Sequence, residues 1–186
     1  MKKGLFVIAM WCLMTLCGEG LAASGPMDVL KSSVIRLAEG VPDREAARIL
    51  DRTLEYDTIG LEVLGDSASG LSEEQVAEFH HVFSELLRRS YLKNISGLKG
   101  ARIEWLDEIY VPKLDSAKVK VRAVRGGETV DMSFWMVYKF DRWCVADVEV
   151  ESVSMVDTWR SQVRKIIKRD GFSGLIAKLR AKLTKG

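Results

Sequence analysis

A glycine pair, Gly126-Gly127, separates two segments in which apolar and polar residues alternate, residues 117–125 and 128–140. This arrangement predicts a β-hairpin with a two-residue turn, because the favoured turn types need the positive φ angles that glycine adopts easily. Such a turn also fixes which residues face each other. The facing residues agree in polarity: Arg125–Glu128, Ala123–Val130, Arg122–Asp131, Val121–Met132 and Val119–Phe134.

Two further alternating segments, residues 101–110 and 143–151, flank the hairpin and predict an antiparallel meander of about four strands. A two-residue turn at Asp141-Arg142 would set apolar residues of the third strand opposite acidic residues of the fourth. We therefore expect a three-residue loop or a β-bulge between these strands. The shifted register pairs apolar residues: Met136 with Val148 and Phe134 with Val150.

The predicted sheet has one continuous apolar face and one mixed face. The apolar face is formed by alternate residues of the hairpin and the last strand: Val119, Val121, Met132, Phe134, Met136, Tyr138, Val148 and Val150. Ile103 and Trp105 share one face of the first strand. We expect the mixed face to carry Lys118, Lys120, Arg122, Trp135, Val137, Trp143 and Val145.

Apolar residues at helical spacing precede and follow the sheet. They predict helices over 27–38, 42–54, 56–64 and 72–94, with a loop over 65–71 and Ser72 and Gln75 as a capping box. After the sheet, a helix beginning near Val156 ends at Asp170-Gly171, and Ser173 can cap a last one. The fold class is therefore α+β, with N-terminal and C-terminal helices packed on one sheet face around an apolar cavity.

The first 23 residues have the layout of a secretory signal peptide. Lys2-Lys3 precedes a short apolar run, Leu5–Leu16, and small residues follow at Gly20–Ala23. We expect cleavage after Ala22 or Ala23, which leaves one domain over residues 24–186. We expect this domain to be exported to the periplasm. A lipoprotein would instead be acylated at Cys17, but Leu16 stands where a small residue is needed.

The exported chain keeps a single cysteine, Cys144, so it can form no internal disulfide. We interpret this cysteine as a buried structural residue.

The chain has few side chains of the types used in catalysis. His80 and His81 are adjacent and would point about 100° apart on a helix, which suits a helix surface better than a shared site. Asp107 and Glu108 are expected to be strand-end charges rather than an acid–base pair. The chain contains no G-x-S-x-G, P-loop, H-E-x-x-H or C-x-x-C motif, so binding is favoured over catalysis.

Charge is unevenly distributed along the chain. The whole sequence has a net charge of +2, which does not suit a protein whose entire surface binds nucleic acid. From Arg160 to Gly186, however, nine Lys and Arg residues accompany one acid. These helices are either solvated surfaces or a docking surface for anionic headgroups or an acidic partner.

Three motifs give the chain a resemblance to a known family. They are L-G…S-x-E-Q-x3-F from Leu64 to Phe79, F-x2-L-L-x3-Y from Phe83 to Tyr91, and W-x-V-x-D-V-x-V-x-S-V-S-M-V-x-x-W-R-S-Q-V from Trp143 to Val163. In these the chain resembles the MlaC family, also called toluene-tolerance proteins. The resemblance implies a non-enzymatic carrier, without metal or cofactor, that holds phospholipid acyl chains in an apolar cavity.

The same resemblance implies partners and a role. The partners would be an outer-membrane lipoprotein complex and an inner-membrane MCE-domain ABC transporter, and the role would be maintenance of outer-membrane lipid asymmetry. Some relatives are linked to hopanoids, so a carrier of another lipid stays an alternative. Two further alternatives are a structural or adaptor protein with a filled core and an enzyme that uses the same pocket.

We predict that the acyl chains contact the apolar sheet face and one side of the helices. The sheet residues are Ile103, Trp105, Val119, Val121, Met132, Phe134, Met136, Tyr138, Val148 and Val150. The helix-side residues are Leu87, Tyr91, Val153, Trp159 and Val163. We call these fifteen residues the predicted lipid site.

Overall fold

The computed structural model describes residues 24–95 and 99–185. The predicted signal peptide, residues 1–23, lies outside the described residues.

In the described part of the chain, the four expected helices precede the sheet, together with a short 3-10 turn. They are α1 (Pro26–Ala38), α2 (Asp43–Thr53), α3 (Tyr56–Leu64), η1 (Gly65–Gly70) and α4 (Glu73–Asn94). The predicted capping box is confirmed, because Ser72 accepts from the backbone N–H of Gln75 and the Gln75 side chain accepts from the backbone N–H of Ser72. The segment expected to be a loop over 65–71 folds largely as the 3-10 turn η1.

Five antiparallel strands follow in sequential order, one more than expected, because a two-residue strand adds to the edge. They are β1 (Arg102–Val111), β2 (Ser116–Arg125), β3 (Glu128–Lys139), β4 (Arg142–Val150) and β5 (Val153–Ser154). A short 3-10 turn, η3 (Pro112–Leu114), connects β1 to β2. The hairpin register is confirmed at every pair, from Arg125–Glu128 to Val119–Phe134. Both turn glycines have positive φ angles, 60° and 87°.

The connection from β3 to β4 differs from the predicted register. The turn residues are Phe140 and Asp141, both with positive φ. The connection is therefore a two-residue turn rather than a three-residue loop, and it lies one residue before the Asp141-Arg142 turn that the sequence analysis rejected. The expected β-bulge is confirmed, and Ala146 is its extra residue, between Val145 and Asp147 on β4. The predicted pairs are wrong: Met136 faces Val145 rather than Val148, and Phe134 faces Val148 rather than Val150.

The bulge also changes which β4 residues share a face. Directly facing residues in antiparallel strands have side chains on the same side of the sheet. Trp143 faces Tyr138 and Val145 faces Met136, so both belong to the apolar face. We had placed Trp143 and Val145 on the mixed face. This assignment is wrong because it assumed uninterrupted alternation along the whole of β4, whereas the bulge at Ala146 shifts the residues before it to the other face.

The C-terminal helix α5 (Met155–Lys185) is interrupted at Gly171, as the sequence predicted. Gly171 has φ 70° and ψ 179°, a conformation that is essentially restricted to glycine. The chain is helical on both sides of this residue, so α5 consists of two segments joined at a kink.

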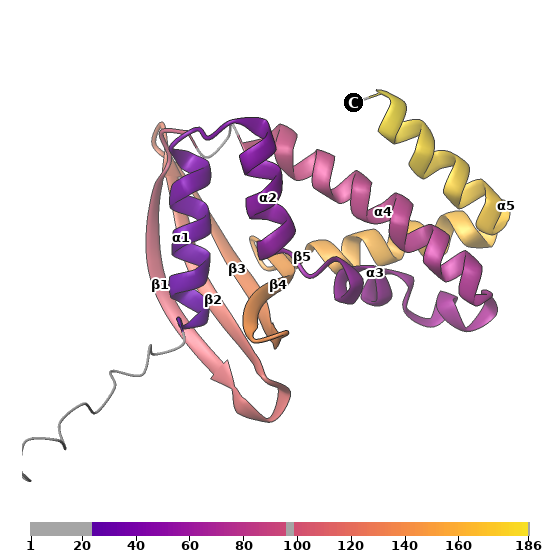
Figure 1. Ribbon diagram of the computed structural model, residues 1–186, viewed down its shortest axis with the longest axis horizontal. Coiled ribbons are helices and arrows are strands. Elements are labelled where there is room, and N and C mark those ends of the chain that lie inside the picture. The colour runs from indigo at the N-terminus through magenta and orange to yellow at the C-terminus, as the bar shows by residue number, and fades with distance from the viewer. Residues whose placement is uncertain (1–23, 96–98, 186) are drawn as a thin grey trace, which may run out of the picture.

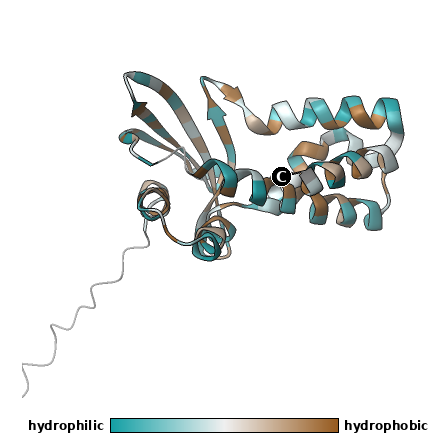
Figure 2. Ribbon diagram, turned by 90° about the horizontal axis from the view of Figure 1, so that it is seen from above, coloured by the Kyte–Doolittle hydropathy of each residue, from teal (hydrophilic) through white to brown (hydrophobic). Residues whose placement is uncertain are grey.

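The helices form two groups around the sheet (Figure 1). Helices α1 and α2 lie on the same side of the sheet, as the view from above shows (Figure 2). Helices α3, α4 and α5 pack against one another beside the strands, and α5 contacts β4 and β5. One contiguous apolar core runs from α1 and α2 along the apolar face of the sheet into the α3–α5 bundle. None of the helices in the described part of the chain has the length and apolar character needed to cross a bilayer.

The sheet face opposite the core carries paired charges. Lys118 Nζ lies 2.7 Å from Glu149 Oε2 and 4.8 Å from the centroid of the Trp135 ring. Trp135 Nε1 donates to Glu149 Oε1 at 2.7 Å. Burial raises the pKa of Glu149, but the hydrogen bonds from Lys118 and Trp135 outweigh it, and the net pKa lies below the usual value.

Replacing this carboxylate should give a pH-dependent loss of stability. A group whose pKa is lowered by folding stabilises the protein above its unfolded pKa, about 4.3 for Glu, and this contribution is lost as the pH falls through the folded pKa. We expect Glu149→Gln to lower the free energy of unfolding by about 1 kcal/mol at pH 7. The difference from the unsubstituted protein should shrink below pH ~4. Urea unfolding across this range measures it, with exposed Glu39 changed to Gln as the control; a pH-independent difference would contradict the assignment.

The kink in α5 should tolerate no side chain. Alanine at Gly171 would be forced into a backbone region that costs about 1–3 kcal/mol. We expect Gly171→Ala to destabilise the protein by that amount in thermal or urea unfolding. Gly70→Ala is the control, because Gly70 lacks a positive φ and a Cβ there meets no atom within 4 Å. Equal stability of the two variants would contradict the kink.

Candidate functional site

The structure brings most of the predicted lipid site into one apolar core. Six of the fifteen residues are buried members of that core: Leu87, Val119, Val121, Met136, Val148 and Val163. Seven more are partly buried and pack against it: Tyr91, Ile103, Trp105, Met132, Phe134, Val150 and Trp159. We call the sheet residues of both groups the apolar wall.

Two residues of the predicted lipid site lie at its margin. Tyr138 is 37% exposed near the β3–β4 turn, and its ring centroid lies 5.3 Å from that of Trp143. Val153 is 54% exposed on the short edge strand β5. Neither belongs to the core that joins the other thirteen.

Trp143 is a neighbour of the wall that the sequence analysis missed. It contacts Tyr138 on β3 and, edge to face at 5.9 Å between ring centroids, Tyr110 on β1. These three rings close one end of the apolar wall. The only sequence signal for this position was the poor pairing of an unbulged β4, which indicated a bulge but not its location.

Three of the helix-side residues meet the wall around a narrow cavity of about 10 Å³. Leu87 and Tyr91 of α4, Val148 of β4 and Trp159 of α5 are among its lining residues. Burial raises the pKa of the Tyr91 phenol to about 12, and the charge of nearby Asp147 adds to the shift. Tyr91 is therefore neutral at physiological pH and contributes an apolar ring to this cavity.

Asp147 and Ser154 together stabilise the start of α5, where the Ser154 hydroxyl accepts the backbone N–H of Asp157 at 3.0 Å. Asp147 Oδ1 accepts the backbone N–H groups of Val148 at 2.7 Å and Val156 at 3.0 Å, and its Oδ2 accepts the Ser154 hydroxyl at 2.6 Å. A carboxylate is favourable at a helix N-terminus, where backbone N–H groups lack partners. Asp147, which follows the bulge, thus ties the end of the sheet to the helix that carries Trp159 and Val163.

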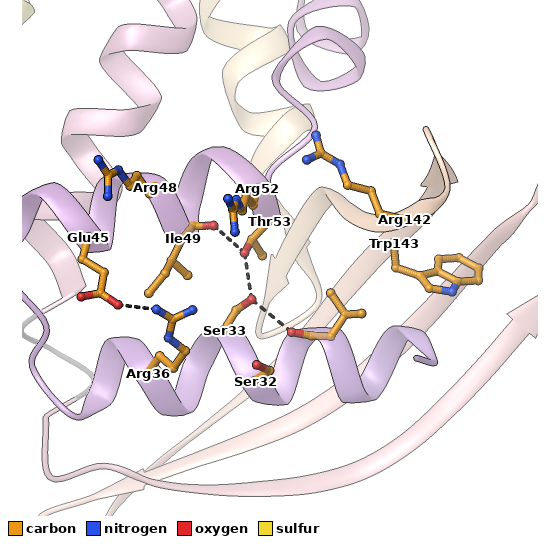
Figure 3. Close-up of a pocket in the computed structure, with 11 residues that line it drawn as sticks. Ser32, Ser33, Arg36, Glu45, Arg48, Ile49, Arg52, Thr53, Arg142 and Trp143 are labelled. Atoms are coloured by element: carbon orange, nitrogen blue, oxygen red, sulfur yellow. Dashed lines mark hydrogen bonds and ion pairs between the residues drawn. The ribbon is translucent and has the colours of Figure 1, made fainter. Parts of the chain in front are cut away.

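A second, polar pocket of about 540 Å³ lies between α1, α2 and the start of β4 (Figure 3). We call it the arginine pocket. Its lining residues are Val29, Ser32, Ser33, Arg36, Glu45, Arg48, Ile49, Arg52, Thr53, Arg142 and Trp143. The pocket adjoins the core, because Trp143 pairs with Tyr138 at the end of the wall and Ile49 is a buried core residue.

Hydroxyl groups join the two helices of this pocket. Ser33 Oγ and Thr53 Oγ1 lie 2.9 Å apart, Ser33 donates to the Val29 carbonyl, and Thr53 to that of Ile49 (Figure 3). Arg36 forms an ion pair with Glu45 across the two helices. The sequence analysis did not identify this pocket. The i, i+4 spacing of Arg48 and Arg52 was visible, but the packing of α1 on α2 was not.

The two histidines occupy different environments, and one expectation about them is wrong. His81 is exposed on α4, as expected. The His80 side chain is only 17% exposed, because it packs against Gly60 of α3, and its Nδ1 lies 3.6 Å from Asp57 Oδ1. Gly60 permits this approach, since a Cβ there would lie 3.2 Å from the ring. No group of three or more potential metal ligands occurs among the described residues.

Cys144 is fully buried, as predicted, with its Sγ 3.9 Å from the Arg52 carbonyl oxygen. Burial raises the pKa of this thiol, so it is protonated and unreactive at neutral pH.

The basic C-terminal segment is partly neutralised by acids of neighbouring helices. Arg160 pairs with Glu62 of α3, and Arg180 pairs with Glu78 of α4.

The site thus combines an apolar sheet face covered by helices with a polar pocket at its end. The comparisons with known proteins give the class of protein. Residues 33–181 match the model of the MlaC protein family, so the chain belongs to the MlaC family. Proteins of this family are non-enzymatic lipid-binding carriers, which confirms the prediction that the chain is not an enzyme.

A solved structure has the same fold. It is the phospholipid-binding protein from Ralstonia solanacearum, determined in complex with a phospholipid. The two chains are 16% identical, the match covers 88% of this chain and 97% of that chain, and the TM-score is 0.72. No curated protein matches the chain.

Removing the charge at Asp147 should loosen α5 from the sheet. Hydrogen bonds to a charged group contribute about 1.5–3 kcal/mol, and this carboxylate accepts three. We expect Asp147→Asn to lower the free energy of unfolding by about 2 kcal/mol. Asp157→Asn, in the first turn of the same helix, removes an exposed charge and should cost less than about 1 kcal/mol. Equal losses in urea unfolding would contradict the proposed cap.

Proposed function

We propose that the protein is a periplasmic phospholipid carrier that holds acyl chains against the apolar wall. It would exchange lipid with an outer-membrane lipoprotein complex and an inner-membrane MCE-domain ABC transporter, and so help to maintain outer-membrane lipid asymmetry. The resemblance of its motifs to the MlaC family supports these partners. The predicted signal peptide over residues 1–23 supports the compartment.

The apolar wall is the observation that carries this proposal. Its large side chains form one surface across β1 to β4, and the outer ones, among them Trp105, Met132 and Phe134, are only partly buried. Methionine and aromatic side chains adapt easily to chains of different shape. The phospholipid bound by the Ralstonia protein of the same fold supports a lipid as the ligand.

The physical task needs a cavity and no catalytic group. Each methylene moved out of water contributes about 0.8 kcal/mol, so two acyl chains with about 30 methylenes would cost on the order of 20 kcal/mol to expose. A carrier lowers this cost by covering the chains while the headgroup stays wet. The chain's few catalytic side chains fit this role.

One observation favours the alternative of an adaptor protein with a filled core. The inner residues of the wall are almost fully buried: Val119 and Met136 are 0% exposed and Val121 is 2% exposed. For acyl chains to reach these residues, helices must separate from the sheet. Detection of bound lipid separates the two functions, because an adaptor with a filled core would hold no lipid.

The first test is mass spectrometry of the mature protein purified from a bacterial periplasm without detergent. A carrier should give a stoichiometric lipid adduct in native spectra that disappears on denaturation. Analysis of the extracted material would then separate a phospholipid from a hopanoid. A bare protein that also takes up no lipid from vesicles would contradict the proposal and favour the filled-core adaptor.

A charge on the wall should abolish lipid binding without unfolding the sheet. Phe134 is partly buried on the wall, and its neighbour Ser133 lies on the opposite face, paired with Lys120. We expect Phe134→Asp to lose co-purifying lipid and Ser133→Asp to retain it, because only the first places a carboxylate against acyl chains. Thermal melting confirms that both variants fold. A folded Phe134→Asp protein with normal lipid content would contradict the wall assignment.

A further inference from the structure

The arginine pocket adjoins one end of the apolar wall. Trp143 connects the two sites: its ring contacts Tyr138 at the end of the wall, and it also lines the pocket. Ile49 joins them as well, since it is buried in the core and lines the pocket. A molecule with an apolar and a polar end could therefore occupy both sites at once.

The positive charge of the arginine pocket favours an anionic group as the polar end of such a molecule. Four arginines and one glutamate line it, which gives a formal charge of +3. The glutamate, Glu45, is already paired with Arg36. Neither Arg48 nor Arg52 forms an ion pair within the described part of the chain, and both are exposed on α2. An anion would gain from these guanidinium groups, whereas an ammonium group would find no free carboxylate among the lining residues.

Guanidinium groups suit phosphate in particular. Their planar arrangement of N–H donors matches two phosphate oxygens at once, and the resulting bonds are stronger than neutral hydrogen bonds. The hydroxyl group of Ser32 adds a donor beside them. The volume of about 540 Å³ is within the usual range of about 300–1,000 Å³ for small-molecule sites.

We propose that the arginine pocket binds the phosphate of a phospholipid headgroup and makes the protein prefer anionic phospholipids over zwitterionic ones. This inference rests on the proposed function, because it places the acyl chains of the same lipid on the apolar wall. Arg48, Arg52 and Arg142 supply the charge, and Trp143 marks the boundary between the two parts of the ligand. The basic C-terminal segment of α5 has no part in this selection.

The test measures selection between two lipids that differ only in the headgroup. Delipidated protein is incubated with vesicles of equal amounts of phosphatidylglycerol and phosphatidylcholine with identical acyl chains, then re-isolated, and its lipids are quantified by mass spectrometry. We expect phosphatidylglycerol to be enriched on the unsubstituted protein. The double variant Arg48→Gln/Arg52→Gln should lower the enrichment about tenfold, or to equality if the initial preference is smaller.

The matched control removes the same charge elsewhere. Arg164→Gln/Lys168→Gln takes two exposed cations from α5 at the same i, i+4 spacing. It should keep the enrichment, because the preference comes from the pocket and not from attraction of the whole protein to anionic vesicles. Both double variants change exposed residues, and thermal melting verifies that they fold.

The outcomes separate this inference from the proposed function. Protein that takes up neither lipid contradicts both. Uptake of both lipids in equal amounts, or an enrichment that the Arg48→Gln/Arg52→Gln variant retains, overturns the inference and leaves the carrier intact. A pocket specific for a free anion would bind inorganic phosphate in calorimetry without any lipid preference, and that result would also overturn the inference.

Discussion

The β-bulge at Ala146 interrupts the alternation of β4 and lets both halves of the strand contribute to one face. Without it, Val145 and Val148 would point to opposite sides of the sheet, because successive residues alternate. The bulge also brings Asp147 to the N-terminus of α5, where its carboxylate accepts three hydrogen bonds. The continuous apolar core and the attachment of α5 to the sheet both follow from this one extra residue.

The two faces of the sheet have different tasks. One face packs against α1, α2 and the α3–α5 bundle and supplies the apolar wall. The other is stabilised by cross-strand pairs such as Lys118–Glu149 and Arg122–Asp131, which let it face water. Because the polar side needs no helix cover, the helices can gather on the apolar side, where a ligand would have to enter between them and the strands.

Helices α1 and α2 contribute to both candidate sites. Their apolar sides bury Leu30 and Ile49 in the core, and their facing polar sides form the arginine pocket. The Ser33–Thr53 contact and the Arg36–Glu45 ion pair link the two helices across that pocket. An amphipathic ligand would therefore meet an apolar and a cationic surface built by the same helix pair, which is the arrangement that its two ends require.

The sequence by itself determined the elements whose information is local. The turn at Gly126-Gly127 set the β2–β3 register, the capping box at Ser72 began α4, and Gly171 interrupted α5. The motifs also identified the MlaC family and most of the apolar wall, since alternation in a strand assigns residues to faces.

Only the tertiary structure decided the features that depend on packing between distant segments. It located the bulge at Ala146 and so moved Trp143 to the apolar face, because the early turn at Phe140-Asp141 and the bulge together set the pairing of β4. It also buried His80 against Gly60 and assembled the arginine pocket from α1, α2 and β4. No spacing within one segment can reveal such sites, because their residues become neighbours only when helices pack on each other and on the sheet.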